Sequence, residues 1–153
     1  MTVRTALRLT RARRADAAPC AAILHEWIAE TGWFPTADPV SARPQAVAEM
    51  IRRGRVTVAR ADGIAGFAAV EGRFLRCLYV ARGWRGQGVG RALLDDAKAR
   101  SKGNLRLWTF RANMRARQFY QREGFAEVQR TDGAGNEEGL PDIEMLWRQE
   151  GTR

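Results

Sequence analysis

The sequence contains little cysteine and histidine, and this scarcity limits the metal chemistry open to it. Cys20 and Cys77 are its two cysteines, they form no C-x-x-C pair, and His25 is its one histidine. Zinc sites in proteins are built from clusters of these two residue types. We therefore expect no metal site.

Long apolar runs are also missing. No run approaches the roughly 20 apolar residues that a membrane-spanning helix needs. The basic start of the chain is not followed by the apolar segment of a secretory signal. These absences favour a cytoplasmic protein with no membrane partner.

Lysine is scarce as well, although the chain is basic. It has 26 lysine and arginine residues against 17 aspartate and glutamate residues, a net charge of +9, and only Lys98 and Lys102 are lysines. A basic surface can attract nucleic acid, anionic lipid or a polyanionic cofactor. No basic stretch is interleaved with stacking aromatic residues, so compositional bias explains the arginine excess better than an RNA-binding surface does.

The 153 residues suit one domain, spanning residues 1–153, with a substantial core. Segments with helical spacing of apolar residues alternate with segments of strand spacing. Helices are predicted from the cap residue Asp16 to Gly32, over 41–53, over 88–102, and from the cap residue Asn113 to Gly124. Strands are predicted over 3–9, 55–59, 64–70, 74–81, 105–110, 126–130 and 143–147. This order indicates an α/β domain with a mixed sheet.

Residues 77–91 carry the strongest functional signal. A short apolar run, 77–81, is typical of a buried strand, and three glycines at alternate positions follow it, Gly86, Gly88 and Gly90. Helical spacing of apolar residues begins among these glycines. The first N–H groups of a helix have no internal partner, and glycine lets a phosphate approach the backbone. Three glycines exceed what a tight turn that binds nothing would require, so the segment predicts a phosphate-binding loop.

Two common phosphate-binding motifs do not fit this loop. A P-loop ends in Gly-Lys-Ser/Thr, whereas Arg91 follows Gly90 here. The dinucleotide motif G-x-G-x-x-G needs a small residue at position 91 and an acidic residue about 20 positions later, and neither is present. The pattern Arg/Gln-x-x-Gly-x-Gly/Ala does fit, with Arg85, Gly88 and Gly90 at its fixed positions. It resembles the acetyl-coenzyme A loop of the GCN5-related N-acetyltransferase (GNAT) superfamily.

A second motif follows the loop. Asn113-x-x-Ala116-x-x-Phe119-Tyr120, and then Gly124-Phe125, resembles the GNAT motif N-x-x-A-x-x-F-Y-x-x-x-G-F. The resemblance implies a GNAT-like acyl-CoA N-acyltransferase fold, with a central mixed, mostly antiparallel sheet of about seven strands flanked by about four helices. It also implies an acetyl-coenzyme A-dependent N-acetyltransferase, in which a primary amine attacks the thioester directly in a ternary complex.

The resemblance assigns roles to residues of both motifs. The strand edge at Leu78, Tyr79 and Val80, exposed where the strand splays from the next one, binds the pantetheine arm. The N–H of Leu78 or Val80 polarises the thioester carbonyl. Asn113 contacts the cofactor, and Tyr120 is the general acid for the leaving thiolate, since a phenol is protonated at neutral pH. Without the loop motif, a core tyrosine would be the better interpretation. The N–H groups that bind the diphosphate come from Arg85, Gly86, Gln87, Gly88, Val89, Gly90 and Arg91.

The general base is less well defined. Many family members carry an acidic residue on the cofactor strand, where this chain has Arg76 and Cys77. Glu71, at the end of the preceding strand, is the nearest substitute, although it can equally be a turn carboxylate, and a chain of waters is the alternative base. An apolar cysteine on a strand is most often inert packing, so we do not expect Cys77 to carry the acetyl group.

The acceptor site is expected in the variable parts of the chain. Trp27 lies in the first predicted helix, and Trp33 and Phe34 follow in a loop, where they form either a lid over a ligand or ordinary packing. Glu137 and Glu138 lie in a late acidic loop of an otherwise basic protein. These carboxylates either attract a cationic amine or are simply solvated.

The predicted acceptor is a small-molecule amine or a protein amino group. Two other functions are alternatives: a catalytically silent module that binds acetyl-coenzyme A, and a nucleic-acid-binding protein that uses the positive charge. The presence of Asn113 and Tyr120 argues against the silent module. Proteins of this class often dimerise, so a homodimer is compatible with the resemblance.

Overall fold

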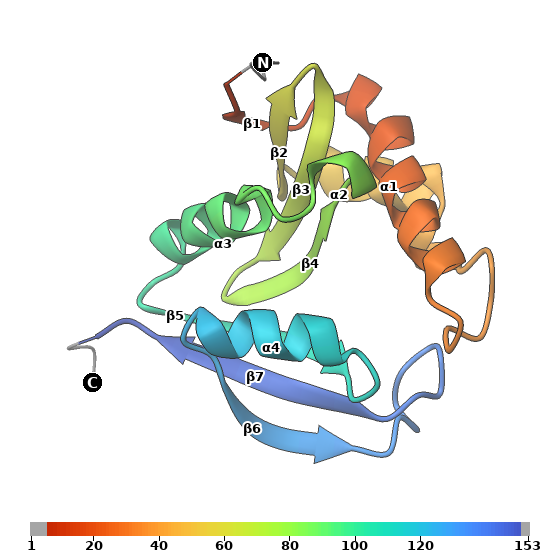
Figure 1. Ribbon diagram of the computed structural model, residues 1–153, viewed down its shortest axis with the longest axis vertical. Coiled ribbons are helices and arrows are strands. Elements are labelled where there is room, and N and C mark those ends of the chain that lie inside the picture. The colour runs from red at the N-terminus through yellow and green to blue at the C-terminus, as the bar shows by residue number, and fades with distance from the viewer. Residues whose placement is uncertain (1–5, 151–153) are drawn as a thin grey trace.

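The computed structural model describes residues 6–150, which form a seven-stranded sheet flanked by helices (Figure 1). The strand order is β1-β2-β3-β4-β5-β7-β6. The helices are α1 (Ala17–Glu30), α2 (Pro44–Arg52), α3 (Val89–Arg100) and α4 (Met114–Arg122). The strands are β1 (Arg8–Arg11), β2 (Val56–Ala61), β3 (Gly63–Glu71), β4 (Phe74–Val80), β5 (Asn104–Phe110), β6 (Ala126–Thr131) and β7 (Asp142–Arg148). Short 3-10 turns are η1 (Arg14–Asp16), η2 (Val40–Ala42) and η3 (Arg82–Trp84).

Neighbouring strands of the described sheet run antiparallel, with the single exception of β4 and β5. β2 and β3 are joined by the tight turn that Asp62 and Gly63 predict. β4 connects to β5 through α3, because parallel strands need a long crossover. The sheet is therefore mixed and mostly antiparallel, which confirms the predicted fold class.

The two faces of β3 contribute to two separate cores. Phe67 is fully buried on the face that α1 and α2 cover, whereas Ala68 is buried on the face that α3 covers. Gly66 lets α3 approach the sheet closely, since a Cβ there would lie 2.8 Å from the carbonyl oxygen of Tyr79 and 3.1 Å from the Val89 side chain. This packing fixes the first turn of α3, and with it the preceding loop, against β3 and β4.

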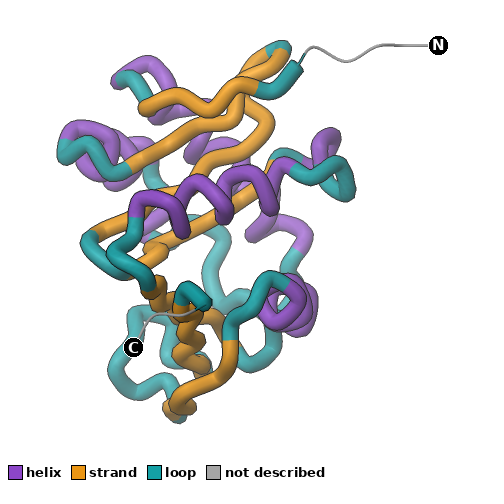
Figure 2. Tube along the Cα trace, turned by 90° about the vertical axis from the view of Figure 1, so that its left-hand side faces the viewer, coloured by secondary structure: helices purple, strands orange, loops and turns teal. Residues whose placement is uncertain are grey.

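The sheet opens between β4 and β5. These strands pair only at two positions, Phe74 with Arg106 and Leu75 with Leu107, and diverge beyond them. In Figure 2 the upper strands and the lower strands of the molecule run in clearly different directions. The divergence confirms the expected splay, and it leaves the end of β4 without a described strand on that side.

The start of α1 differs from the prediction. Asp16 does not cap the helix with its side chain. Instead its carboxylate pairs with the guanidinium of Arg60 in β2 and accepts a hydrogen bond from the N–H of Arg13 at 2.7 Å. The Arg60 hydrogen bond, more than any other contact, holds the pKa of Asp16 below its usual range. The residue thus ties the start of α1 to the sheet.

Two further boundaries differ from the prediction. β1 begins at Arg8, while Val3 and Thr5 of the predicted strand lie outside the described residues. The second helix begins at Pro44 rather than at residue 41, because η2 precedes it and proline suits the first helical position.

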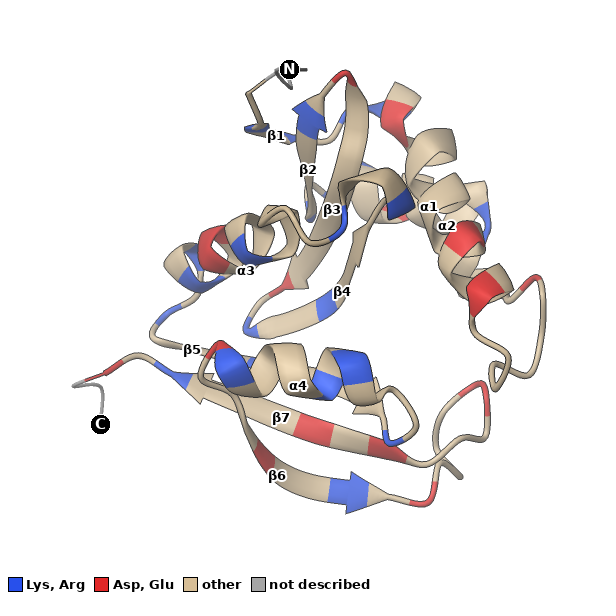
Figure 3. Ribbon diagram, viewed as in Figure 1, with Lys and Arg blue, Asp and Glu red and all other residues tan. Residues whose placement is uncertain are grey.

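Basic and acidic residues are interspersed along the helices and strands (Figure 3). Many of the arginines pair with nearby carboxylates. On α2, for example, Glu49 lies 2.7 Å from Arg52 and 2.9 Å from Arg53. None of the described helices has the length and apolar character needed to cross a membrane.

Candidate functional site

A cavity of about 760 Å³ occupies the opening between β4 and β5. It is lined by β4, the loop into α3, α4, the end of β5 and the segment before β7, so it brings the two sequence motifs together. The predicted site residues that line it are Trp27, Leu78, Tyr79, Val80, Arg85, Gly86, Gly88, Val89, Gly90, Arg91, Asn113, Tyr120 and Glu138. The predicted site residues that do not line it are Trp33, Phe34, Glu71, Gln87 and Glu137.

Two backbone N–H groups of β4 point toward this cavity. The N–H of Ala81 donates to the carbonyl oxygen of Ala65 in β3 at 2.8 Å, and N–H directions alternate along a strand. The N–H groups of Leu78 and Val80 therefore point away from β3, to the side from which β5 has diverged. Donors placed in this way can bind a carbonyl oxygen that gains negative charge.

The glycine loop adds a second set of backbone donors. Gly86 and Gly88 have φ angles of +74° and +82°, and a Cβ on either would meet no atom within 4 Å. The first hydrogen bond of α3 runs from the N–H of Ala92 to the carbonyl oxygen of Gly88 at 3.0 Å. Within the described residues, the N–H groups of 86–91 have no protein acceptor. Free donors at a helix start, beside open space, fit the diphosphate of coenzyme A.

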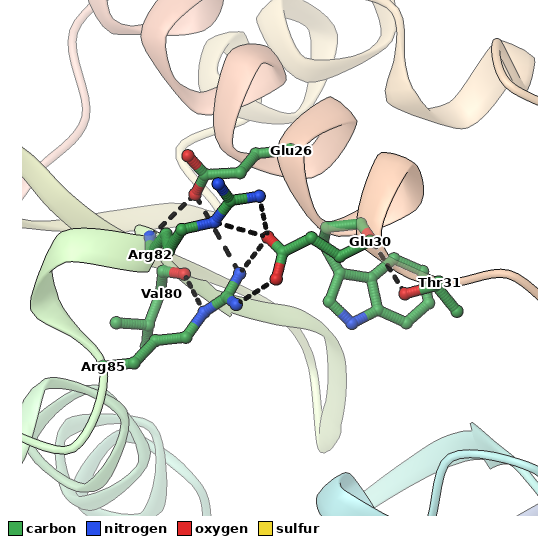
Figure 4. A network of polar contacts seen from close by, with 7 residues as sticks. Glu26, Glu30, Thr31, Val80, Arg82 and Arg85 are labelled. Atoms are coloured by element: carbon green, nitrogen blue, oxygen red, sulfur yellow. Dashed lines mark hydrogen bonds and ion pairs between the residues drawn. The ribbon is translucent and has the colours of Figure 1, made fainter.

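The guanidinium of Arg85 is engaged by other protein groups. It donates to the Glu30 carboxylate of α1 at 2.6 and 3.1 Å, and to the carbonyl oxygen of Val80 at 3.3 Å (Figure 4). Arg91, by contrast, has 72% of its side chain exposed and lies 3.5 Å from Glu123. A phosphate at this loop therefore meets backbone donors, while Arg85 holds the loop to α1 and β4.

Tyr120 projects from α4 into the cavity. Its ring packs edge-on against Phe119 and Phe125, with ring centroids 5.2 and 5.4 Å apart. The residue is 8% exposed, and burial raises the pKa of its phenol. The raised pKa keeps the hydroxyl protonated at neutral pH, and in the described part of the chain it makes no hydrogen bond, so it is available to a ligand.

Asn113 fixes the start of the helix that carries Tyr120. Its Oδ1 accepts a hydrogen bond from the N–H of Ala116 at 3.1 Å, as the capping prediction requires. The residue also lines the cavity. Its position is therefore compatible with both a capping and a ligand-binding role.

Glu71 lies outside the cavity, at the end of β3. Its carboxylate pairs with Arg55 and lies 3.8 Å from Arg76, and the Arg55 hydrogen bond holds the pKa of Glu71 below its usual range. The structure thus does not bring Glu71 together with Tyr120. Cys77 does line the cavity, but burial raises the pKa of its thiol to about 12, which makes it a poor nucleophile.

The aromatic residues around α1 form one cluster. The ring of Trp27 lies 5.8 Å from that of Trp33 and 5.5 Å from that of Phe34, centroid to centroid. Phe110 at the end of β5 extends the cluster, 5.7 Å from Trp33. Trp33 and Phe34 do not line the cavity, but both pack against Trp27 and Phe110, which do.

The loop before β7 contributes Asn136 and Glu138 to the cavity, and Asp142, the first residue of β7, follows them. Asn136 braces the loop: its amide donates to the carbonyl oxygen of Leu140 at 2.7 Å and accepts from the Leu140 N–H at 3.2 Å. Gly133 packs so tightly here that a Cβ would lie 2.3 Å from the Leu140 backbone. Two carboxylates therefore face the cavity here, Glu138 from the braced loop and Asp142 from the start of β7.

Three residues in or beside the site were not singled out in the sequence: Phe110, which lines the cavity, and Glu26 and Glu30, which hold Arg82 and Arg85. Phe110 faces Asp142 in the β5–β7 register, and only the pairing of these distant strands reveals that Phe110 reaches the cavity. Glu26 and Glu30 carried a usable signal, since two carboxylates four residues apart lie on one side of a helix. That spacing predicts that the two carboxylates can bind one neighbouring segment, but it does not predict that this segment contains Arg82 and Arg85.

The comparisons with known proteins agree with this geometry. Residues 52–127, about half of the chain, match the model of the acetyltransferase (GNAT) domain family. The matched segment includes the glycine loop and Tyr120. A comparison with curated protein sequences gives no significant match.

Solved structures share the fold over nearly their whole length. YjaB from Escherichia coli superposes with a TM-score of 0.78 at 21% identity, covering 94% of this chain and 99% of that one. A ribosomal-protein-alanine N-acetyltransferase from Brucella melitensis has a TM-score of 0.70 at 24% identity, covering 92% and 99%. A PaiA N-acetyltransferase from Thermoplasma acidophilum, solved in complex with coenzyme A, has a TM-score of 0.75 at 18% identity, covering 94% and 99%.

These TM-scores show a common fold, and the segment that matches the family model contains the motifs on which the cavity is built. The splayed β4 edge, the free N–H groups of the glycine loop and the Tyr120 hydroxyl occur together in this fold. The chain belongs to the GNAT superfamily of acetyl-coenzyme A-dependent N-acetyltransferases.

Proposed function

We propose that the protein transfers an acetyl group from acetyl-coenzyme A to a primary amine by direct attack in a ternary complex. The observation that carries the proposal is the convergence of three donor sets on one cavity: the N–H groups of Leu78 and Val80, those of residues 86–91, and the Tyr120 hydroxyl. They match three parts of the thioester donor, which are its carbonyl oxygen, its diphosphate and its sulfur.

Each donor set has a task in the reaction. The amine nitrogen forms a bond to the carbonyl carbon and then gives up a proton to solvent, and the bond from that carbon to sulfur breaks. Leu78 and Val80 stabilise the charge that gathers on the carbonyl oxygen. Tyr120 hydrogen-bonds to the departing sulfur, gives it a proton and recovers that proton from solvent. Burial raises the phenol pKa, so the group is protonated before the reaction, although a higher pKa also makes it a weaker acid toward the thiolate.

We assign deprotonation of the incoming ammonium to water rather than to Glu71. The Glu71 carboxylate is paired with Arg55 outside the cavity, and a carboxylate with a lowered pKa is a weak base. The ammonium need only reach neutrality at the moment of attack.

For the acceptor we propose a cationic amine that also carries apolar surface. Glu138, before β7, and Asp142, at the start of β7, give the cavity negative charge, and Trp27 and Phe110 give it aromatic walls. Such a combination suits a small amine or an amino group of a protein. Glu137 takes part, if at all, through its charge alone, since it does not line the cavity.

Calorimetric titration with coenzyme A and thiol-release assays across a panel of amines and peptides test the proposal. We expect coenzyme A binding and amine-dependent release of thiol from acetyl-coenzyme A. Binding without any thiol release would favour the silent module, and failure to bind coenzyme A would overturn the proposal. Oligonucleotide binding that survives saturating coenzyme A would reveal a separate nucleic-acid function.

A further inference from the structure

We propose that Glu30, assisted by Glu26, is a positioning residue for the diphosphate-binding loop, residues 81–88 between β4 and α3. The inference rests on the proposed function, because the loop must bind a diphosphate for its position to matter. Both carboxylates belong to α1, the helix that also carries the cavity residue Trp27. Neither carboxylate lies in the two sequence motifs of the family.

Glu30 holds two arginines that flank the start of the loop. Its Oε2 lies 2.6 Å from Nη1 of Arg85, and its Oε1 lies 3.1 Å from Nη2 of Arg85. The same Oε1 lies 3.1 Å from Nη2 of Arg82. Figure 4 shows the two guanidinium groups meeting this one carboxylate. The Arg85 hydrogen bond, above all, holds the pKa of Glu30 below its usual range, so the carboxylate is charged throughout the neutral range.

The Glu26 carboxylate holds the loop by a hydrogen bond to the loop backbone. Its Oε1 accepts a hydrogen bond from the N–H of Arg82 at 2.7 Å, directly after β4 ends. It also lies 3.9 Å from the Arg85 guanidinium. Glu26 and Glu30 are one helical turn apart on α1. The helix therefore holds both the Arg82 N–H near the start of the loop and the Arg85 side chain at its middle.

Arg85 completes the connection to β4. Its Nε donates to the carbonyl oxygen of Val80 at 3.3 Å, while its two Nη atoms are held by Glu30. The side chain is 27% exposed, so these bonds are partly shielded from water. Glu30 therefore fixes Arg85 across the end of β4, and the free N–H groups that begin at Gly86 start from a fixed point.

Loss of the Glu30 charge has opposite expected effects on coenzyme A affinity under simple electrostatics and under a positioning role. Coenzyme A is a polyanion, so removing the negative charge of Glu30 and freeing two guanidinium groups should strengthen its binding if charge alone mattered. Positioning predicts the opposite, because the loop donors lose their fixed arrangement before the ligand arrives.

The test compares Glu30→Gln and Glu30→Ala with Glu49→Gln. Glu49 is a matched control: it also pairs with two arginines, Arg52 and Arg53, but on α2 and away from the cavity. Titration calorimetry with coenzyme A should show about tenfold weaker binding for both Glu30 variants than for the wild type. The affinity of Glu49→Gln should equal that of the wild type. Pantetheine, which lacks the diphosphate, should bind all four proteins equally in a chemical-shift titration at millimolar concentrations.

A second readout needs no ligand. In the free protein, amide hydrogen exchange at Arg85 and Ala92, whose N–H groups donate to Arg82 and Gly88 within the loop, should be faster in the Glu30 variants than in the wild type, while exchange in β2 and β3 and the thermal midpoint stay close to wild type. A general loss of protection would instead mean a structural defect and would contradict the positioning role.

The outcomes separate this inference from the proposed function. Wild-type protein that binds coenzyme A, together with Glu30 variants that bind it equally or more tightly, would overturn the role of Glu30 and leave the acetyltransferase standing. Glu30 variants that lose affinity for coenzyme A and for pantetheine by the same factor would also overturn the role of Glu30. Wild-type protein that does not bind coenzyme A would overturn both.

Discussion

Tyr120 presents a protonated hydroxyl to the cavity from a helix whose start Asn113 fixes. If it serves the departing sulfur, Tyr120→Phe should lower kcat by about 100-fold and leave the affinity for coenzyme A near that of the wild type. Calorimetry and steady-state kinetics on the same preparations check this split. A variant with unchanged kcat across the pH range would show that the proton comes from elsewhere.

Asp16 provides a residue-scale prediction about stability. It is 5% exposed and pairs with Arg60, and its pKa is lowered in the folded state. A lowered folded pKa contributes stability above the unfolded pKa, which is lost as pH falls through the folded value. Asp16→Asn should therefore cost about 2 kcal/mol near neutral pH, with a smaller difference from wild type in acid below the unfolded pKa. Chemical denaturation at both pH values measures this.

The exposed Glu49→Gln variant is the control for that experiment. Its partners Arg52 and Arg53 lie on the same helix, in water, so its loss should not change the denaturation midpoint measurably. A cost for Asp16→Asn that did not shrink in acid would mean that the carboxylate acts through packing rather than through its charge.

At the scale of the element, the loop between β4 and α3 depends on glycines with positive φ. Gly88→Ala should cost about 1 kcal/mol of stability, because a Cβ is strained in the left-handed region. It should also weaken coenzyme A binding by more than about tenfold, because the Cβ enters space where the diphosphate is expected. Denaturation and calorimetry separate the two effects.

Gly72 offers a matched control in the turn between β3 and β4. Its φ is +62°, and a Cβ there would also meet open space, but the residue does not line the cavity. Gly72→Ala should show the same loss of stability and an unchanged affinity for coenzyme A. Equal affinity losses for both variants would indicate that backbone strain, rather than ligand contact, weakens binding.

The elements near the site were predictable where local sequence determines them. The Asp62-Gly63 turn, the Asn113 cap and the glycine loop each act over a few residues, and the structure contains all three. Contacts between distant segments were not predictable in this way. Arg85 and Glu30 are 55 residues apart, and their pairing depends on where α1 crosses the end of β4. Asp16 was interpreted as a helix cap because its partner Arg60 lies 44 residues away in the sequence.

At the scale of the whole molecule, β1–β4 and β5–β7 form two parts of one sheet that share only two paired positions between β4 and β5. The cavity lies where pairing stops, so residues from both parts line it, Leu78 and Val80 on one side and Phe110 on the other. The mixed sheet follows from the order of predicted elements, but the point of divergence does not, because it is set by the register of β4 against β5.

A ligand that fills this opening should act as a bridge between the two parts. Coenzyme A at one hundred times its Kd should add about 3 kcal/mol to the free energy of unfolding and raise the Tm by roughly 5–10 °C. The amides of Leu78 and Val80 face the opening, so their hydrogen exchange should slow far more than that of Cys77 and Tyr79, which point toward β3. Scanning calorimetry and exchange measured by NMR check both effects. Slowing that is equal at all four amides would mean that the ligand tightens the sheet as a whole without binding along the free edge of β4.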